Sequence, residues 1–136
     1  VRSIQGGRLA SQYLTRRYTG INSIYYNYVA AGMRRAVLSG TCYAANIPGI
    51  EVCGKTGTAE NRGQDHSVFM GFAPMNNPQI AISVYVENGG WGADYGVPIG
   101  ALLIEQYING KLSASSEKKA EVMQHKHISY GVTKSI

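Results

Sequence analysis

Residues 54–58 read Gly-Lys-Thr-Gly-Thr and place a cation, two hydroxyls and two residues without side chains within five positions. The residues just before them are mostly apolar, so we predict one strand over 50–59. A strand that only packs against a core has no need of a long cation beside hydroxyl groups. Lys55 supplies positive charge, and Thr56 and Thr58 supply hydroxyl donors, a combination suited to an anion such as a carboxylate.

Gly57 leaves this strand open to approach by another chain. Without a side chain at that position, a ligand backbone can lie against the strand and use its N–H and C=O groups. This requires a strand at the edge of a sheet, because a strand flanked on both sides has no free backbone groups. We therefore expect a ligand that is peptide-like and negatively charged.

Lys-Thr-Gly is one of three signatures of penicillin-binding proteins and class A β-lactamases. Its surroundings are more specific: residues 65–74 read Asp-His-Ser-Val-Phe-Met-Gly-Phe-Ala-Pro, residues 84–90 read Val-Tyr-Val-Glu-Asn-Gly-Gly, and Gly32-Met33 and Gly40-Thr41 stand upstream. This series resembles the C-terminal part of the transpeptidase domain of a class B penicillin-binding protein. The resemblance covers most of residues 1–110 and is greatest to the penicillin-binding protein 2 branch.

The resemblance implies a peptidoglycan D,D-transpeptidase. A serine would attack the penultimate D-Ala carbonyl of a stem peptide, release the last D-Ala and pass the acyl group to an amine on another strand, and β-lactams would be trapped at the same step. By position, Lys55 would support proton movement and the backbone N–H of Thr58 would help to bind the oxyanion. Thr56 and Thr58 would bind the substrate carboxylate, and Gly57 would keep the strand open.

The nucleophile for this chemistry is not evident in the chain. Ser115 and Lys118 match the family's Ser-x-x-Lys spacing, but they follow Lys55 whereas the family's nucleophile precedes it, so we interpret the match as chance. No Ser-x-Asn motif stands upstream of Lys55 either. We expect a fragment that is inactive alone and that depends on the N-terminal part of the same domain.

Other classes of function stay open. A serine β-lactamase or a penicillin-sensing receptor domain could share the strand, and a noncatalytic wall-binding module could keep the strand without the chemistry. Asp65 and His66 invite an acid–base interpretation, but a role at the entry to the next strand is favoured. His125 and His127 lack cysteine or acidic partners at ligand spacing, so no metal or other cofactor is expected.

The periodicity of the chain predicts an α+β fold in which three strands, over 50–59, 67–73 and 80–86, form an antiparallel meander. Similarity to the β-lactamase/transpeptidase fold implies that they belong to a five-stranded sheet packed against helices. Two strands of that sheet would lie N-terminal to this chain, which leaves the edge at 80–86 unpaired.

Helical spacing predicts a first helix over 22–39, capped at Asn22 or Ser23 and ended by a left-handed Gly40. Its tyrosines are expected to pack on the sheet; they are Tyr25, Tyr26 and Tyr28.

A second helix is expected through 98–107, with Asp94 as a possible cap and Asn109-Gly110 at its end. It would cover one face of the sheet. Trp91 lies in the loop before it, where it could touch substrate, although a role in anchoring the loop is favoured.

The ends of the chain are less regular. We predict a short strand over 1–5, an extended loop over 8–21, a domain portion over 1–110 and a polar, basic tail over 111–136 with a marginal helix over 118–127.

The chain has 136 residues, 44% of them hydrophobic, and a formal net charge of +5. This content supports a packed core, and the basic residues are spread too widely to indicate nucleic-acid binding. No signal peptide or membrane span is apparent in the sequence. The resemblance implies a protein at the periplasmic face of the inner membrane, held there by an anchor outside this chain. Cys42 and Cys53 could form a disulfide, although a buried free Cys53 behind the strand is favoured.

Overall fold

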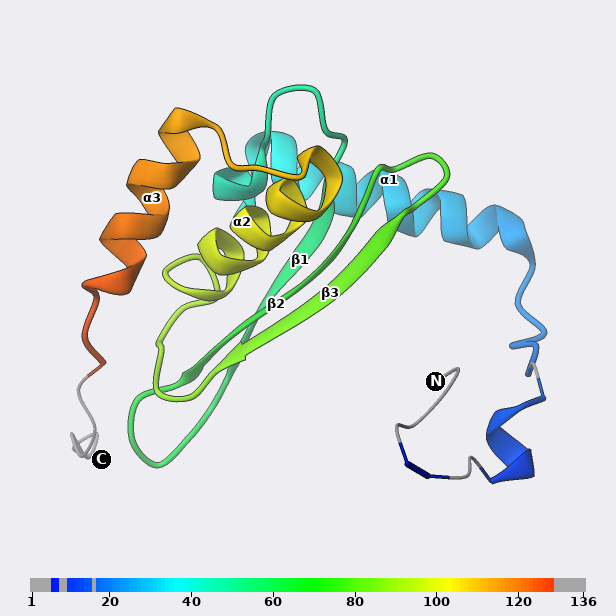
Figure 1. Cartoon of the computed structure of the whole chain (residues 1–136). Helices are drawn as coiled ribbons and strands as arrows, with labels where there is room; N and C mark the ends of the chain where they lie inside the picture. The colour runs from blue at the N-terminus through cyan, green and yellow to red at the C-terminus, as the bar shows by residue number, and fades with distance from the viewer. Residues whose placement is uncertain (1–5, 8–9, 16, 129–136) are drawn as a thin grey trace.

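The computed structural model describes residues 6–7, 10–15 and 17–128, so the strand predicted over 1–5 lies outside the described residues. The elements follow one another as a 3₁₀ helix η1 (Ser11–Tyr13), α1 (Ser23–Ser39), a 3₁₀ helix η2 (Tyr43–Ala45), β1 (Cys53–Ala59), β2 (His66–Ala73), β3 (Ile80–Val86), α2 (Gly96–Asn109) and α3 (Ala114–Gln124). This is the predicted α+β fold (Figure 1).

The strands form one antiparallel sheet in the order β1-β2-β3. Its three strands lie close to their predicted ranges, although β1 begins at Cys53 and not at residue 50. Residues 47–50 instead form a turn closed by a bridge between Ile47 and Ile50. Within the described part of the chain, the outer edges of β1 and β3 have no strand partner, as the meander predicts.

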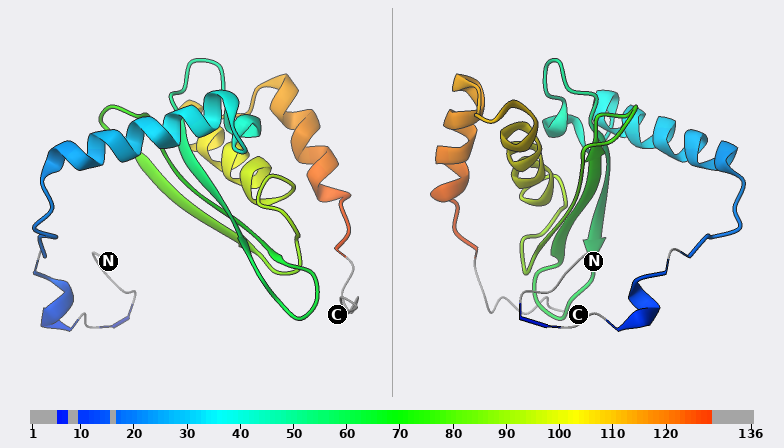
Figure 2. Two further views of the ribbon diagram at one scale, coloured as in Figure 1. Left: turned by 180° about the vertical axis from the view of Figure 1, so that it is seen from behind. Right: turned by 45° about the vertical axis from the view of Figure 1, so that its right-hand side comes forward.

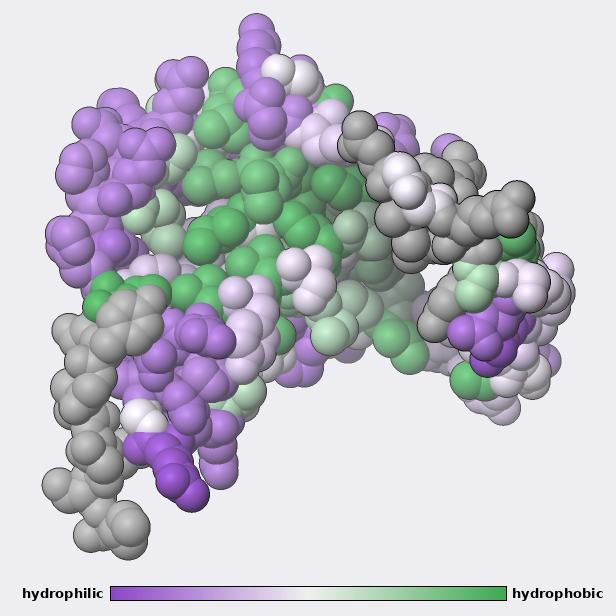
Figure 3. All heavy atoms as spheres, turned by 60° about the horizontal axis from the view of Figure 1, so that its bottom comes forward, coloured by the Kyte–Doolittle hydropathy of each residue, from purple (hydrophilic) through white to green (hydrophobic). Residues whose placement is uncertain are grey.

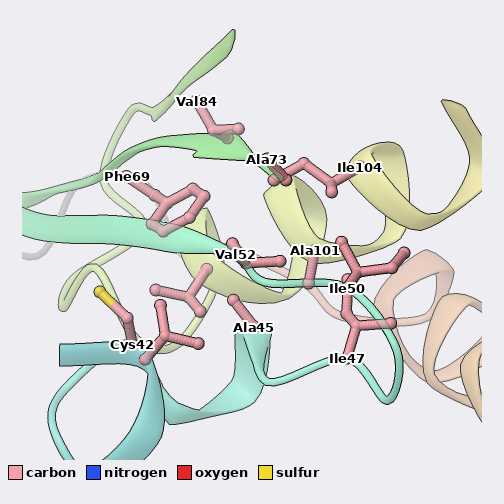
Figure 4. Packing of buried hydrophobic residues seen from close by; sticks show 12 residues of the cluster. Cys42, Ala45, Ile47, Ile50, Val52, Phe69, Ala73, Val84, Ala101 and Ile104 are labelled. Carbon is pink, nitrogen blue, oxygen red and sulfur yellow. The ribbon is translucent and has the colours of Figure 1, made fainter. Parts of the chain in front are cut away.

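Helices lie on both sides of the sheet. In the right-hand view of Figure 2, α2 and α3 are on one side of the strands and α1 is on the other. The core is concentrated under α2, where Phe69, Val84, Ala101 and Ile104 are buried together (Figure 4). Alternation along β3 sends Val84 into this core and exposes Tyr85, as its sequence pattern predicts.

The first helix begins where predicted, because the side chain of Asn22 accepts a hydrogen bond from the backbone of Ile24 at 3.1 Å. Its end differs from the prediction. Gly40 is extended, with φ −117°, and is not left-handed. The backbone N–H groups of Gly40 and Cys42 both donate to the carbonyl of Ala36, and this shared acceptor ends the helix.

The prediction that the tyrosines of α1 pack on the sheet is wrong for the described structure. Tyr25, Tyr26 and Tyr28 are 60%, 48% and 70% exposed. The N-terminal half of α1 runs past the end of the sheet (Figures 1 and 2), so these side chains have no strand beneath them. Val37, near the other end of the helix, is its one fully covered residue among those described.

The second helix covers β2 and β3 and ends at a left-handed Gly110 with φ 72°, as predicted. Asp94 is not its cap, since Tyr95 holds that position and makes no capping hydrogen bond with its side chain. The helix instead begins at Gly96, whose backbone N–H donates to the buried hydroxyl of Ser67.

The tail folds earlier and packs more closely than predicted. Ser113 caps α3, and its backbone N–H donates to the carboxylate of Glu105 on α2 at 3.0 Å. Burial alone would raise the pKa of Glu105, but hydrogen bonds from Ser116 and Ser113 and the charge of Lys119 outweigh it and hold that pKa below its ordinary value. Figure 3 shows the hydrophilic side chains of α3 beside the apolar middle of this face.

The two thiols are free and buried, so the disulfide is not formed. Cys53, the first residue of β1, is the buried free cysteine that the sequence favoured. Within the described ranges, none of the helices has the length and apolar character needed to cross a membrane.

We expect Glu105→Ala to release α3 from α2. The variant leaves the Ser113 N–H and the Ser116 hydroxyl without their buried partner, a loss of about 1–3 kcal/mol. Amide hydrogen exchange over 114–124 should accelerate while exchange in β2 stays unchanged. Glu121→Ala, at an exposed position on α3, is the matched control and should exchange like the parent.

The same contact gives a pH dependence of known sign. Because the folded-state pKa of Glu105 is lowered, its contribution to docking is complete above the ordinary glutamate pKa and is lost as pH falls through the folded value. Exchange over 114–124, corrected for intrinsic rates, should therefore rise in acid and should do so less in Glu105→Gln. Equal acid sensitivity in the two proteins would contradict this assignment.

Candidate active site

A hollow of about 290 Å³ opens along the outer edge of β1. It is lined by Thr41, Lys55, Thr56, Gly57, Thr58, Trp91, Gly92 and Ala93. The structure thus gathers the four residues that the sequence singled out and adds two walls, one from the turn after α1 and one from the loop before α2. Among the described residues β1 pairs only with β2, so the predicted edge position is confirmed.

The side chains of β1 are divided between the two faces of the sheet. Thr56 lies opposite Phe69 in the register, which places both on the face that α2 covers. Lys55 is on the other face and is exposed, and its ammonium group donates to the carbonyl of Thr56 at 2.6 Å. This hydrogen bond holds the ammonium group against the strand that carries the hydroxyls, although the side chain is exposed.

Thr41 is a member of the site that reasoning from the sequence did not assign. Its hydroxyl is 2.7 Å from the hydroxyl of Thr56. The next residue, Cys42, is fully buried, and burial raises the pKa of its thiol against the opposing effects of the Thr41 side chain, the Thr56 backbone and the Lys55 charge. The Gly40-Thr41 pair in the family resemblance was the one sequence signal for this wall.

The loop before α2 forms the opposite wall. Trp91 is 73% exposed, so it does not anchor its own loop. The anchor is Ser67, fully buried on β2, which donates to the carbonyl of Trp91 at 2.8 Å and accepts from the N–H of Gly96 at 3.0 Å. Gly92 lies directly on the strands, because a Cβ there would be 2.8 Å from the carbonyl oxygen of Gly57. Reasoning from the sequence did not assign Ser67 to the site, although it stands in the 65–74 segment that carries the family resemblance.

Asp65 and His66 lie outside this hollow. The backbone carbonyl of Asp65 accepts from Gly90 at 2.7 Å, and the Nδ1 atom of His66 accepts from the N–H of Asn88 at 3.0 Å. His66 is also the first residue of β2. Both residues thus hold the turn that follows β3, which agrees with a role at strand entry.

The Ser-x-x-Lys match at Ser115 lies on α3, which packs on α2, and neither Ser115 nor Lys118 lines the hollow. Ser116 and Lys119 satisfy the same spacing, a second match that sequence reasoning missed. Ser116 is buried, and its side chain hydrogen-bonds the carboxylate of Glu105. In the described part of the chain, no group of three or more His, Cys, Asp or Glu residues could hold a metal ion.

Comparison with known proteins identifies the family of this chain. Residues 15–105 match the family model described as the penicillin binding protein transpeptidase domain, which is well over half of the chain. The chain belongs to this family.

Its relatives include peptidoglycan D,D-transpeptidases of several bacteria. The chain is 38% identical over 76 aligned positions to PbpA of Mycobacterium tuberculosis, covering 48% of this chain and 15% of the relative. It is 26% identical over 102 positions to MrdA of Haemophilus influenzae, covering 75% of this chain and 16% of the relative. The chain thus spans about one sixth of the length of these two relatives.

Solved structures of penicillin-binding proteins are also similar to this chain. Penicillin-binding protein 2 of Pseudomonas aeruginosa, in complex with WCK 5153, matches with a TM-score of 0.57 and 37% identity over 69% of this chain and 22% of that one. Penicillin-binding protein A of M. tuberculosis, as a ceftriaxone acyl-enzyme, matches with a TM-score of 0.60 and 28% identity over 65% and 22%. The family membership and the transpeptidase-like fold predicted from the sequence are confirmed.

Replacing Ser67 by alanine should loosen the wall that carries Trp91. The variant leaves the buried N–H of Gly96 without its partner and removes one of the two hydrogen bonds to the Trp91 carbonyl, a cost of about 1–3 kcal/mol in the free energy of unfolding. Denaturant unfolding measures the loss, and tryptophan fluorescence, which has a single source in this chain, reports the loop. Ser83→Ala, at an exposed position on β3, is the matched control and should change neither reading.

Proposed function

We propose that this chain supplies the Lys-Thr-Gly strand of a peptidoglycan D,D-transpeptidase, an enzyme that cross-links stem peptides through an acyl-enzyme and is acylated by β-lactams. The observation that carries the proposal is the hollow at the free edge of β1, which Lys55, Thr56, Gly57 and Thr58 all line. A peptide can lie along such an edge, and its terminal carboxylate can accept hydrogen bonds there.

Each residue of the strand has a role in this proposal. Lys55 assists proton transfer at the reacting serine, and the backbone N–H of Thr58 is one oxyanion donor. The hydroxyls of Thr56 and Thr58 bind the substrate carboxylate. Gly57 keeps the edge clear, because a side chain there would stand between the strand and the peptide.

The nucleophile comes from outside residues 1–136 in this proposal. Neither Ser-x-x-Lys match lines the hollow, so a serine from the N-terminal part of the same domain must complete the site. The fragment by itself is then inactive. The longer protein works at the periplasmic face of the inner membrane, where its substrates are peptidoglycan stem peptides.

Labelling with a fluorescent penicillin tests the function. The longer protein should form a stable covalent adduct, and residues 1–136 alone should form none. Stable labelling of the short chain would contradict the claim that it lacks the nucleophile. Rapid release of hydrolysed penicillin from the longer protein would identify a β-lactamase instead, since only that enzyme turns the adduct over quickly.

In the longer protein, Lys55→Gln should lower the rate of acylation by about 100-fold or more, the range that a positioned proton-transfer group contributes. The second-order rate constant with the same penicillin measures the effect. Lys111→Gln removes an equal charge from an exposed position after α2 and is the matched control. A loss of equal size in both variants would mean that net charge, and not the group at position 55, is responsible.

A further inference from the structure

The hydroxyl pair between Thr41 and Thr56 bridges two segments that are 15 residues apart in the sequence. We propose that Thr41 is a positioning residue, which fixes the hydroxyl of Thr56 so that it donates to the carboxylate of the ligand. This inference rests on the proposed function and adds to it a residue from outside the Lys-Thr-Gly strand.

The argument begins with the single hydrogen atom of a hydroxyl group. A threonine that donates to a ligand carboxylate has no second hydrogen with which to hold itself in place, but its oxygen can still accept. Thr41 is the hydroxyl in reach of that oxygen, at 2.7 Å. When Thr41 donates to Thr56, the hydrogen of Thr56 is left for the ligand, and both side chains face the same hollow.

Thr41 is itself held in place from two sides. Before it, Gly40 lies so close to α1 that a Cβ would be 2.9 Å from both the Cα and the carbonyl oxygen of Ala36. After it, Cys42 is fully buried and its N–H donates to the same carbonyl at 3.1 Å. The chain thus leaves α1 in a tight, fixed turn, which brings the hydroxyl of Thr41 to the strand edge.

The backbone of Thr56 is occupied as well. Its carbonyl accepts from Lys55 at 2.6 Å. Its backbone also hydrogen-bonds the buried thiol of Cys42. With the backbone held in this way, the direction of the Thr56 hydroxyl depends on its side-chain rotamer. Gly92 packs near the Cβ of Thr56, and the hydrogen bond to Thr41 is the polar contact that selects the rotamer.

The first test needs no activity and uses the 136-residue chain. Side-chain scalar couplings of Thr56 report its χ1 rotamer in solution. The parent and Thr41→Ser, which keeps the hydroxyl, should show one rotamer, and Thr41→Val, which keeps the shape, should show averaging. One rotamer in all three proteins would overturn the proposal.

The second test uses the longer protein and a pair of penicillins, one with a free carboxylate and one with that group masked as a methyl ester. Thr41→Val should slow acylation by the free acid roughly three- to tenfold, the factor that one hydrogen bond of ordinary strength is worth. It should leave the ester unaffected, and Thr41→Ser should restore the rate. Equal losses for acid and ester would mean that Thr41 is merely structural, which overturns the proposal.

A double variant completes the design. If Thr41 acts through Thr56, then Thr41→Val combined with Thr56→Val should be no slower with the free acid than Thr56→Val alone. Additive losses would show that Thr41 acts independently and would contradict the positioning role. Failure of the parent protein to be acylated at all would instead refute the proposed function, and the rotamer measurement would still decide the role of Thr41.

Discussion

The aromatic ring of Phe69 fills a space left open by three glycines, and this contact joins the elements that carry the site. A Cβ at Gly54 would be 2.5 Å from the ring, and one at Gly71 would be 2.8 Å from it. Gly100 on α2 closes the space in the same way, and Gly96 lies against the base of the side chain. The ring can therefore be fully buried between two strands and a helix, which sets the face of β1 on which the next residues lie.

The site follows from that constraint. Because Gly54 must lie over the ring, alternation places Thr56 on the same face and Lys55 on the other. The two walls are then held by polar groups: Thr41 bonds to Thr56, and buried Ser67 holds the loop of Trp91. The packing around Phe69 and the hydrogen bonds of the two walls hold the edge of β1 in place before a ligand binds. Binding then orders few protein groups, which suits a ligand that must be held in one orientation.

Local patterns in the sequence predicted much of this arrangement. The cap at Asn22, the alternation along 80–86 and the glycine after α2 depend on neighbouring residues, and all three were predicted correctly. The tyrosines of α1 were not, because helical spacing identifies a shared face but not whether anything lies beneath it. The start of α3 was missed for a related reason, since its first turn depends on Glu105 of another helix.

The hydroxyl bond between Thr41 and Thr56 also turns the segment between them into a closed loop. Both ends are fixed, and the buried pair of Ile47 and Ile50 narrows it again at a bridge. Only the tip, Pro48-Gly49, is exposed there, and a Cβ on Gly49 would touch nothing within 4 Å. Extra residues inserted at this tip would extend into solvent and leave the hydroxyls where they are, so homologues can vary in length here without altering the hollow.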